Sequence, residues 1–113
     1  MPVRVEIDTP ARLVRANVHG PANLTAAEFA DFLGAMTAHP DFRPGFDILY
    51  DRRAVAEPPN QASVRAALGA IEARADRLAG CRWAVVIGPQ PALEIVHLTT
   101  LLGERSGILA RPF

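Results

Sequence analysis

The chain has 113 residues, of which 50% are hydrophobic and 21% are charged, so it can form one domain with a hydrophobic core and is not expected to be disordered. Its 12 basic and 12 acidic residues cancel, which excludes a general attraction to nucleic acid or to anionic membranes. Cys81 is the only cysteine, which excludes an intrachain disulfide and favours a cytoplasmic location, and the sequence has no apolar signal core and no membrane-spanning run.

The first third of the chain predicts a hairpin and a helix. Residues 3–8 and 12–20 alternate between apolar and polar side chains, as half-exposed strands do, and the turn between them is short enough for antiparallel pairing. Thr25 and Glu28 then have the spacing of a capping box, which marks the start of a helix. We expect this helix to end at His39-Pro40, because proline disfavours helical geometry in the residue before it.

The rest of the chain alternates between strands and helices. Phe46–Tyr50 is apolar nearly throughout, which indicates an interior strand covered on both faces. Apolar spacing from Val64 to Leu78 predicts a second helix that starts near Ser63 and ends before Gly80. A buried strand at residues 82–88, a third helix that starts near Pro91, and a short last strand at 108–113 follow. The order β-β-α-β-α-β-α-β predicts one α/β domain over residues 1–113, with a mixed, mainly parallel sheet and flanking helices.

Several short motifs in this order resemble the SpoIIAA-like family of the STAS superfamily, over essentially the whole chain. They are Gly20, Thr25, Glu28, His39-Pro40-Asp41-Phe42, Asp51 with Arg53, Trp83-Ala84-Val85-Val86 and Phe113. The resemblance implies a small cytoplasmic module of bacterial type. It also implies a protein partner, because classical relatives act as anti-sigma factor antagonists that bind a kinase or a sigma-regulating protein. Other SpoIIAA-like proteins are suspected of binding apolar ligands.

The same resemblance implies a phosphorylation switch and a further helix. Classical relatives are phosphorylated on a serine at the start of the helix that follows the strand Phe46–Tyr50. The corresponding stretch here is Pro59-Asn60-Gln61-Ala62-Ser63, so Ser63 is the candidate phosphoacceptor. Relatives also carry a helix after the last strand, whereas this sequence ends at Phe113. We expect the sheet face that this helix would cover to be exposed or covered by a second copy.

The charged residues after Phe46–Tyr50 are the main candidate site. Asp51, Arg52 and Arg53 lie at the carboxyl end of a predicted central strand, where open α/β sheets usually bind ligands. Together with Asn60 and Gln61, these three residues are the predicted partner-binding residues. In this interpretation, Arg52 or Arg53 contacts a carboxylate or phosphate of the partner. The alternative is a solvated strand end in which Asp51 caps a loop and pairs with an arginine. Ser63 is likewise either a phosphoacceptor or a helix N-cap, for which Asn60 competes.

The sequence gives no motif for catalysis, a cofactor or a metal. The histidines and Cys81 lack metal-site spacing, neither serine lies in a nucleophile motif, and we expect Cys81 to be a structural thiol. We therefore expect no enzyme and no metal.

Residues 93–102, in the third predicted helix, are apolar on more than one side. This helix is either buried on both sides in the monomer or contacts a homodimer partner, a target protein or an apolar ligand. Our leading hypothesis is a non-enzymatic, STAS-like protein-interaction module with a regulatory role. The alternative is a small carrier of an apolar ligand such as a fatty acid.

Overall fold

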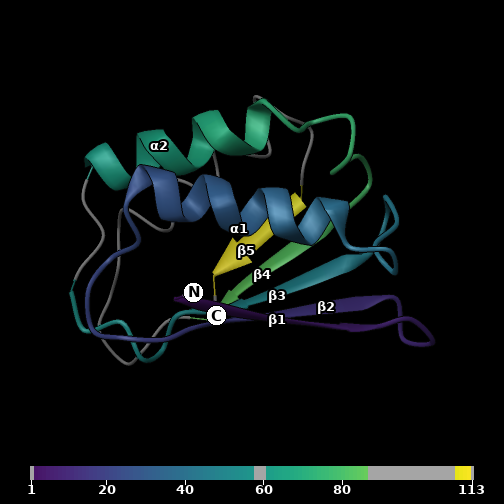
Figure 1. Ribbon diagram of the computed structural model, residues 1–113, viewed down its shortest axis with the longest axis horizontal. Helices are drawn as coiled ribbons and strands as arrows, with labels where there is room; N and C mark the ends of the chain where they lie inside the picture. Colours follow the sequence, from purple (N-terminus) through teal and green to yellow (C-terminus); the bar gives the residue numbers. More distant parts are fainter. Residues whose placement is uncertain (1, 58–60, 87–108, 113) are drawn as a thin grey trace.

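The computed structural model describes residues 2–57, 61–86 and 109–112, which form a sheet and two helices (Figure 1). The α/β class is therefore confirmed, while the full predicted order stays a prediction, because the third predicted helix lies outside the described residues. No helix in the described ranges is long and apolar enough to cross a membrane. In chain order the elements are β1 (Val3–Asp8), β2 (Leu13–Val18), α1 (Ala26–Ala38), β3 (Asp47–Asp51), α2 (Gln61–Glu72), β4 (Arg82–Val86) and β5 (Leu109–Pro112).

The strands form one mixed sheet in the order β1-β2-β3-β4-β5. The predicted hairpin is confirmed, since β1 and β2 pair antiparallel from Val3 opposite Val18 to Asp8 opposite Leu13. The strands from β2 to β5 pair parallel with their neighbours. Because β2, β3 and β4 follow one another in both the chain and the sheet, right-handed crossovers place α1 and α2 on the same face. Figure 1 shows α1 and α2 side by side on that face.

The two helices determine which strand residues form the core. Val14, Ile48 and Trp83 are buried beneath the helices, whereas the alternate residues of each strand point to the other side, which we call the opposite face. The prediction that Phe46–Tyr50 is covered on both faces is not confirmed by the described residues. Leu49 lies on the opposite face and is only half-buried. β4 repeats this pattern, so a nearly continuous apolar run does not by itself show that both faces are covered.

Helix α1 follows its local signals closely. The Thr25 hydroxyl accepts the Glu28 N–H at 3.1 Å, and the Glu28 carboxylate accepts the Thr25 N–H at 2.9 Å, which confirms the capping box. His39 is extended, with φ −62° and ψ 134°, so the helix ends before Pro40 as predicted. The stripe that α1 buries against the sheet consists of Phe29, Phe32, Leu33 and Met36.

Helix α2 begins near Ser63 as predicted but ends earlier than predicted. It begins at Gln61, so Ser63 lies within the first turn and is not the N-cap, contrary to one of the two interpretations of that residue. It ends at Glu72, and the chain continues through tight turns in which Arg74 N–H donates to Ile71 O and Ala75 N–H donates to Glu72 O. Leu78 is nevertheless fully buried, from a turn and not from a helix. Apolar spacing alone therefore placed the end of the helix too late.

Candidate functional site

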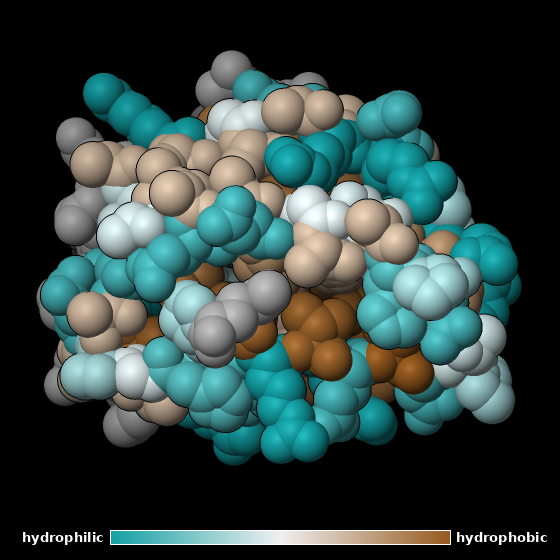
Figure 2. Space-filling model, viewed as in Figure 1, coloured by the Kyte–Doolittle hydropathy of each residue, from teal (hydrophilic) through white to brown (hydrophobic). Residues whose placement is uncertain are grey.

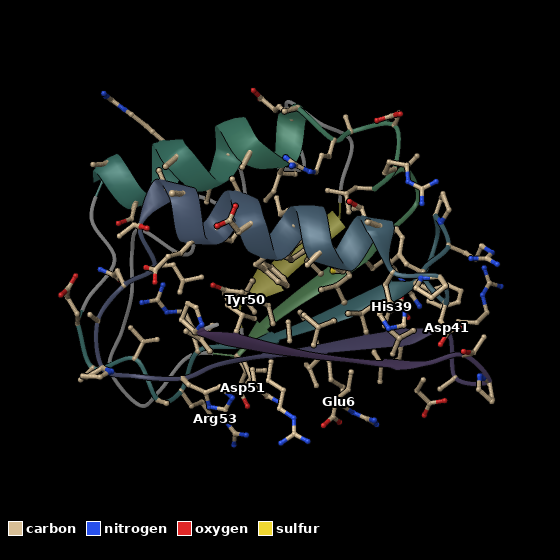
Figure 3. The ribbon with its side chains drawn as sticks, viewed as in Figure 1. Glu6, His39, Asp41, Tyr50, Asp51 and Arg53 are labelled. Atoms are coloured by element: carbon tan, nitrogen blue, oxygen red, sulfur yellow. The ribbon has the colours of Figure 1, made fainter. Side chains whose placement is uncertain are left out.

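The three charged residues after β3 do not form one surface. Because successive strand residues point to opposite faces, Asp51 and Arg53 lie on the opposite face, while Arg52 lies on the same side as Tyr50 and the helices. Figure 3 shows Tyr50 between the sheet and α1, with Asp51 and Arg53 on the far side of the sheet. The backbone N–H of Arg52 donates to Val86 O at 2.9 Å, which fixes this alternation at the end of the strand.

Asp51 and Arg53 are fully engaged with each other. The Arg53 guanidinium donates to both carboxylate oxygens of Asp51, at 3.1 Å from Nε and 2.7 Å from Nη2, and the Arg53 backbone N–H donates to Oδ1 at 3.0 Å. The hydrogen bond from Arg53, more than any other contact, holds the pKa of Asp51 below its usual range. The Arg53 side chain is 66% exposed. This geometry fits the alternative in which a solvated strand end caps its own loop.

Arg52 has a different environment. Its side chain is half-buried, and Nη2 donates to Asn23 Oδ1 at 2.9 Å and to the backbone carbonyl of Glu57 at 3.3 Å. Both acceptors are uncharged. Among the described residues no carboxylate forms an ion pair with Arg52. Burial lowers the pKa of Arg52, and the nearby Tyr50 and Glu57 oppose that effect. The site is thus a partly desolvated cation bound by neutral groups.

Two loops hold Arg52 in place. The N–H groups of Ala56 and Glu57 both donate to Pro21 O, at 3.0 and 2.9 Å, which joins the loop after β3 to the loop after β2. Asn23 connects them again, because its Nδ2 donates to Glu57 Oε1 at 2.8 Å while its Oδ1 accepts from Arg52. Both loops lie at the carboxyl ends of the parallel strands, the edge at which α1 and α2 also begin (Figure 1). This is the edge at which α/β sheets usually bind ligands.

Tyr50, two residues before Arg52, is partly buried and packs against the hydrophobic core. Its ring lies 6.2 Å from Phe29, 5.8 Å from Phe32 and 6.3 Å from Trp83, measured between ring centroids. Burial raises the pKa of Tyr50 to about 12, and the charge of Arg52 opposes the rise. The hydroxyl is therefore neutral at ordinary pH. Beneath it, the buried Nε1 of Trp83 has no hydrogen-bond partner in the described part of the chain.

Sequence reasoning missed Tyr50 and Asn23 as neighbours of Arg52. The alternation of β3 contains the signal for Tyr50, since residues two apart share a face. No local pattern points to Asn23, which is 29 positions away from Arg52 in the sequence.

The other predicted residues are only partly placed. Asn60 lies outside the described residues, as does the apolar segment 93–102 on which the homodimer and apolar-ligand hypotheses rest. Gln61 is the first residue of α2, and Ser63 is half-buried in its first turn. Cys81 is 1% exposed, and burial raises the pKa of its thiol, which fits a structural role. Within residues 2–57, 61–86 and 109–112, no cluster of three or more His, Cys, Asp or Glu could hold a metal ion.

Comparison of the chain with protein-family models, with curated proteins and with solved structures gives no match. The resemblance to the STAS superfamily therefore rests on the sequence motifs alone.

Proposed function

We propose that this protein is a non-enzymatic interaction module that recognises an acidic group on a protein partner through Arg52. The environment of Arg52 is the observation that carries this proposal. Removing a cation from water is unfavourable unless an anion or good hydrogen-bond acceptors replace the water. Asn23 and the Glu57 carbonyl supply neutral acceptors. The Glu57 carboxylate, which Asn23 binds, stabilises the charge of Arg52 without forming an ion pair with it, so the carboxylate or phosphate of a partner would supply the direct charged contact.

The rest of the edge supports binding of an anion. Helices α1 and α2 begin on this side of the sheet (Figure 1), and the first turn of a helix favours negative charge. The loop contacts through Pro21 and Asn23 fix the guanidinium before a partner arrives, which reduces the entropy cost of binding. Arg53 contributes less to this recognition, because its own Asp51 already occupies it.

A regulatory, STAS-like role is the form of this function that the sequence motifs favour. In that role the partner is a kinase or a sigma-regulating protein, and Ser63 in the first turn of α2 is the phosphoacceptor. A phosphate there would lie at the positive end of the helix, which tolerates added negative charge. Incubation with a kinase from the same source, followed by peptide mapping, tests this part separately, and phosphate found elsewhere or nowhere would refute it.

Affinity capture with matched variants tests the proposal. Wild type, Arg52→Met and Arg53→Met are immobilised and exposed to extract from the native source, and the bound proteins are quantified by mass spectrometry. Each variant removes one positive charge and keeps a long side chain. We expect at least one partner protein to be captured by wild type and by Arg53→Met but not by Arg52→Met. Circular dichroism must show that all three proteins are folded. Equal retention by all three proteins would overturn the assignment to Arg52.

A further inference from the structure

The outer edge of β1 carries unpaired backbone groups in a regular array. β1 is the end strand of the sheet, and its pairing with β2 is continuous from Val3 to Asp8. The bond from His19 N–H to Pro2 O, at 2.7 Å, sets the antiparallel alternation, so Pro2, Arg4, Glu6 and Asp8 direct their backbone groups toward β2. Val3, Val5 and Ile7 therefore direct their N–H and C=O groups outward, and no strand of the described ranges pairs with them.

The side chains of β1 do little to block this edge. Arg4 and Glu6 form an exposed pair at 3.2 Å, with side chains 69% and 52% exposed, and Figure 3 shows Glu6 on the face away from α1. Val5 and Ile7 lie on the helix side and are only partly buried. Figure 2 shows apolar surface below α1 on this side of the molecule. A strand edge without a bulge or an internal proline is a template for pairing with another strand.

We propose that a second copy of this chain pairs with this edge, β1 against β1, antiparallel about a two-fold axis at Val5. In this register Val5 lies opposite the partner's Val5, and Val3 lies opposite the partner's Ile7. Every outward N–H and C=O of Val3, Val5 and Ile7 then has a partner across the axis. The sheet continues through both copies, with the partly buried valine and isoleucine side chains packed together on the helix side.

The charges of β1 select this register over its neighbours. With the axis at Val5, Arg4 lies opposite the partner's Glu6 at a position without backbone hydrogen bonds, where opposed side chains come closest. An axis at Arg4 would oppose two arginines. An axis at Glu6 would oppose two glutamates, although it would also place Arg4 opposite the partner's Asp8. An axis at Ile7 would place Glu6 opposite the partner's Asp8. Of these four registers, the one centred on Val5 alone pairs opposite charges without opposing like charges.

Charge exchange tests the register directly. Sedimentation from about 1 μM to about 1 mM, a range suited to a small interface, measures the dimer dissociation constant of wild type, Arg4→Glu, Glu6→Arg and the double variant. We expect each single reversal to weaken the dimer by about tenfold or more, because it opposes like charges twice across the axis. The double variant restores opposite pairs and should return to within about threefold of wild type. Arg65→Glu, on the exposed surface of α2, is the control for net charge and should dimerise as wild type does.

Amide hydrogen exchange supplies an independent readout. In the monomer the Arg4 and Glu6 amides are bonded to β2, whereas the Val5 and Ile7 amides face outward. We therefore expect protection of Val5 and Ile7 to rise with protein concentration, while protection of Arg4 and Glu6 changes little. The proposal would be overturned if wild type stayed monomeric, in which case the edge would be left to a strand of another protein. It would also be overturned if the double variant failed to restore the dimer, or if exchange of the Val5 amide did not depend on protein concentration. The proposal does not depend on Arg52.

Discussion

Tyr50 is the only tyrosine of the chain, so its titration can be followed without labelling. Burial raises its pKa from 10.0 to about 12, and the charge of Arg52 works in the opposite direction. In the unfolded chain the phenol returns to an ordinary pKa of about 10. The folded protein therefore binds the phenolic proton more tightly than the unfolded chain does.

The sign of the effect on stability follows from that difference. Below pH 10 the phenol is neutral in both states, and the favourable contribution is complete. Between about pH 10 and 12 the unfolded chain loses its proton first, so the free energy of unfolding falls as pH rises. One pKa unit corresponds to about 1.4 kcal/mol, so the total loss at Tyr50 is about 2–3 kcal/mol. Cys81, whose pKa is also raised by burial, adds a loss of the same sign that begins at lower pH.

Two measurements separate Tyr50 from the other groups. Ultraviolet absorbance of tyrosinate gives the midpoint of the folded protein directly, while far-ultraviolet circular dichroism shows whether the chain is still folded. Urea unfolding of wild type and Tyr50→Phe between pH 9 and 11.5 gives the loss in stability, and we expect the variant to lose less by about 2 kcal/mol near the upper limit. In Arg52→Met the absorbance midpoint should move upward, because the opposing charge is gone. A midpoint near 10 in a folded chain would refute the packing described for Tyr50.

Three further predictions concern stability. Arg52→Met should lower the free energy of unfolding by about 1 kcal/mol, because it removes the hydrogen bonds to Asn23 and to the Glu57 carbonyl. Arg53→Met, at an exposed position, should change the free energy of unfolding little. Equal urea midpoints for the two variants would contradict this difference. Thr25→Ala should cost about 1 kcal/mol and lower Tm by about 4–8 °C, because the Glu28 N–H loses its partner; calorimetry that shows no change would contradict the cap. The pKa of Asp47 is lowered in the folded protein, mainly by the hydrogen bond from Arg82. The ionised carboxylate therefore contributes to the free energy of unfolding above the ordinary aspartate pKa, and this contribution is lost as pH falls through the pKa of the folded state. Asp47→Asn should therefore have a flatter decline below about pH 4 than wild type in urea titrations at stepped pH, and parallel declines would refute the role of this pair.

Signals that depend on a few neighbouring residues predicted the structure well. The alternation of residues 3–8 and the spacing of Thr25 and Glu28 each concern contacts within one element or one short turn. Their physical basis is local, so the sequence alone could predict the hairpin, the start of α1 and its end at His39.

Features that depend on distant contacts could not be predicted in the same way. The end of α2 depends on Leu78 being buried from a turn, and Arg77 donates from that turn to Thr37 O at the end of α1, 40 positions earlier. The position of α1 and α2 on one face of the sheet follows from strand order and crossover direction, which apolar content does not reveal. Alternation along β3 places Leu49 and Ile48 on different faces, but strand order is needed to determine which of the two faces α1 and α2 cover.

The candidate site shows why single-residue variants are needed. Asp51, Arg52 and Arg53 are consecutive, and a chemical reading of the sequence treats them as one charged patch. The period of two along a strand separates them, so that Arg53 neutralises Asp51 on one face while Arg52 lies half-buried on the other beside Asn23. A variant that removes both arginines would combine the loss of a surface ion pair with the loss of a buried contact between two loops. Any change in binding would then be ambiguous, whereas Arg52→Met and Arg53→Met each remove the same charge from only one of these environments.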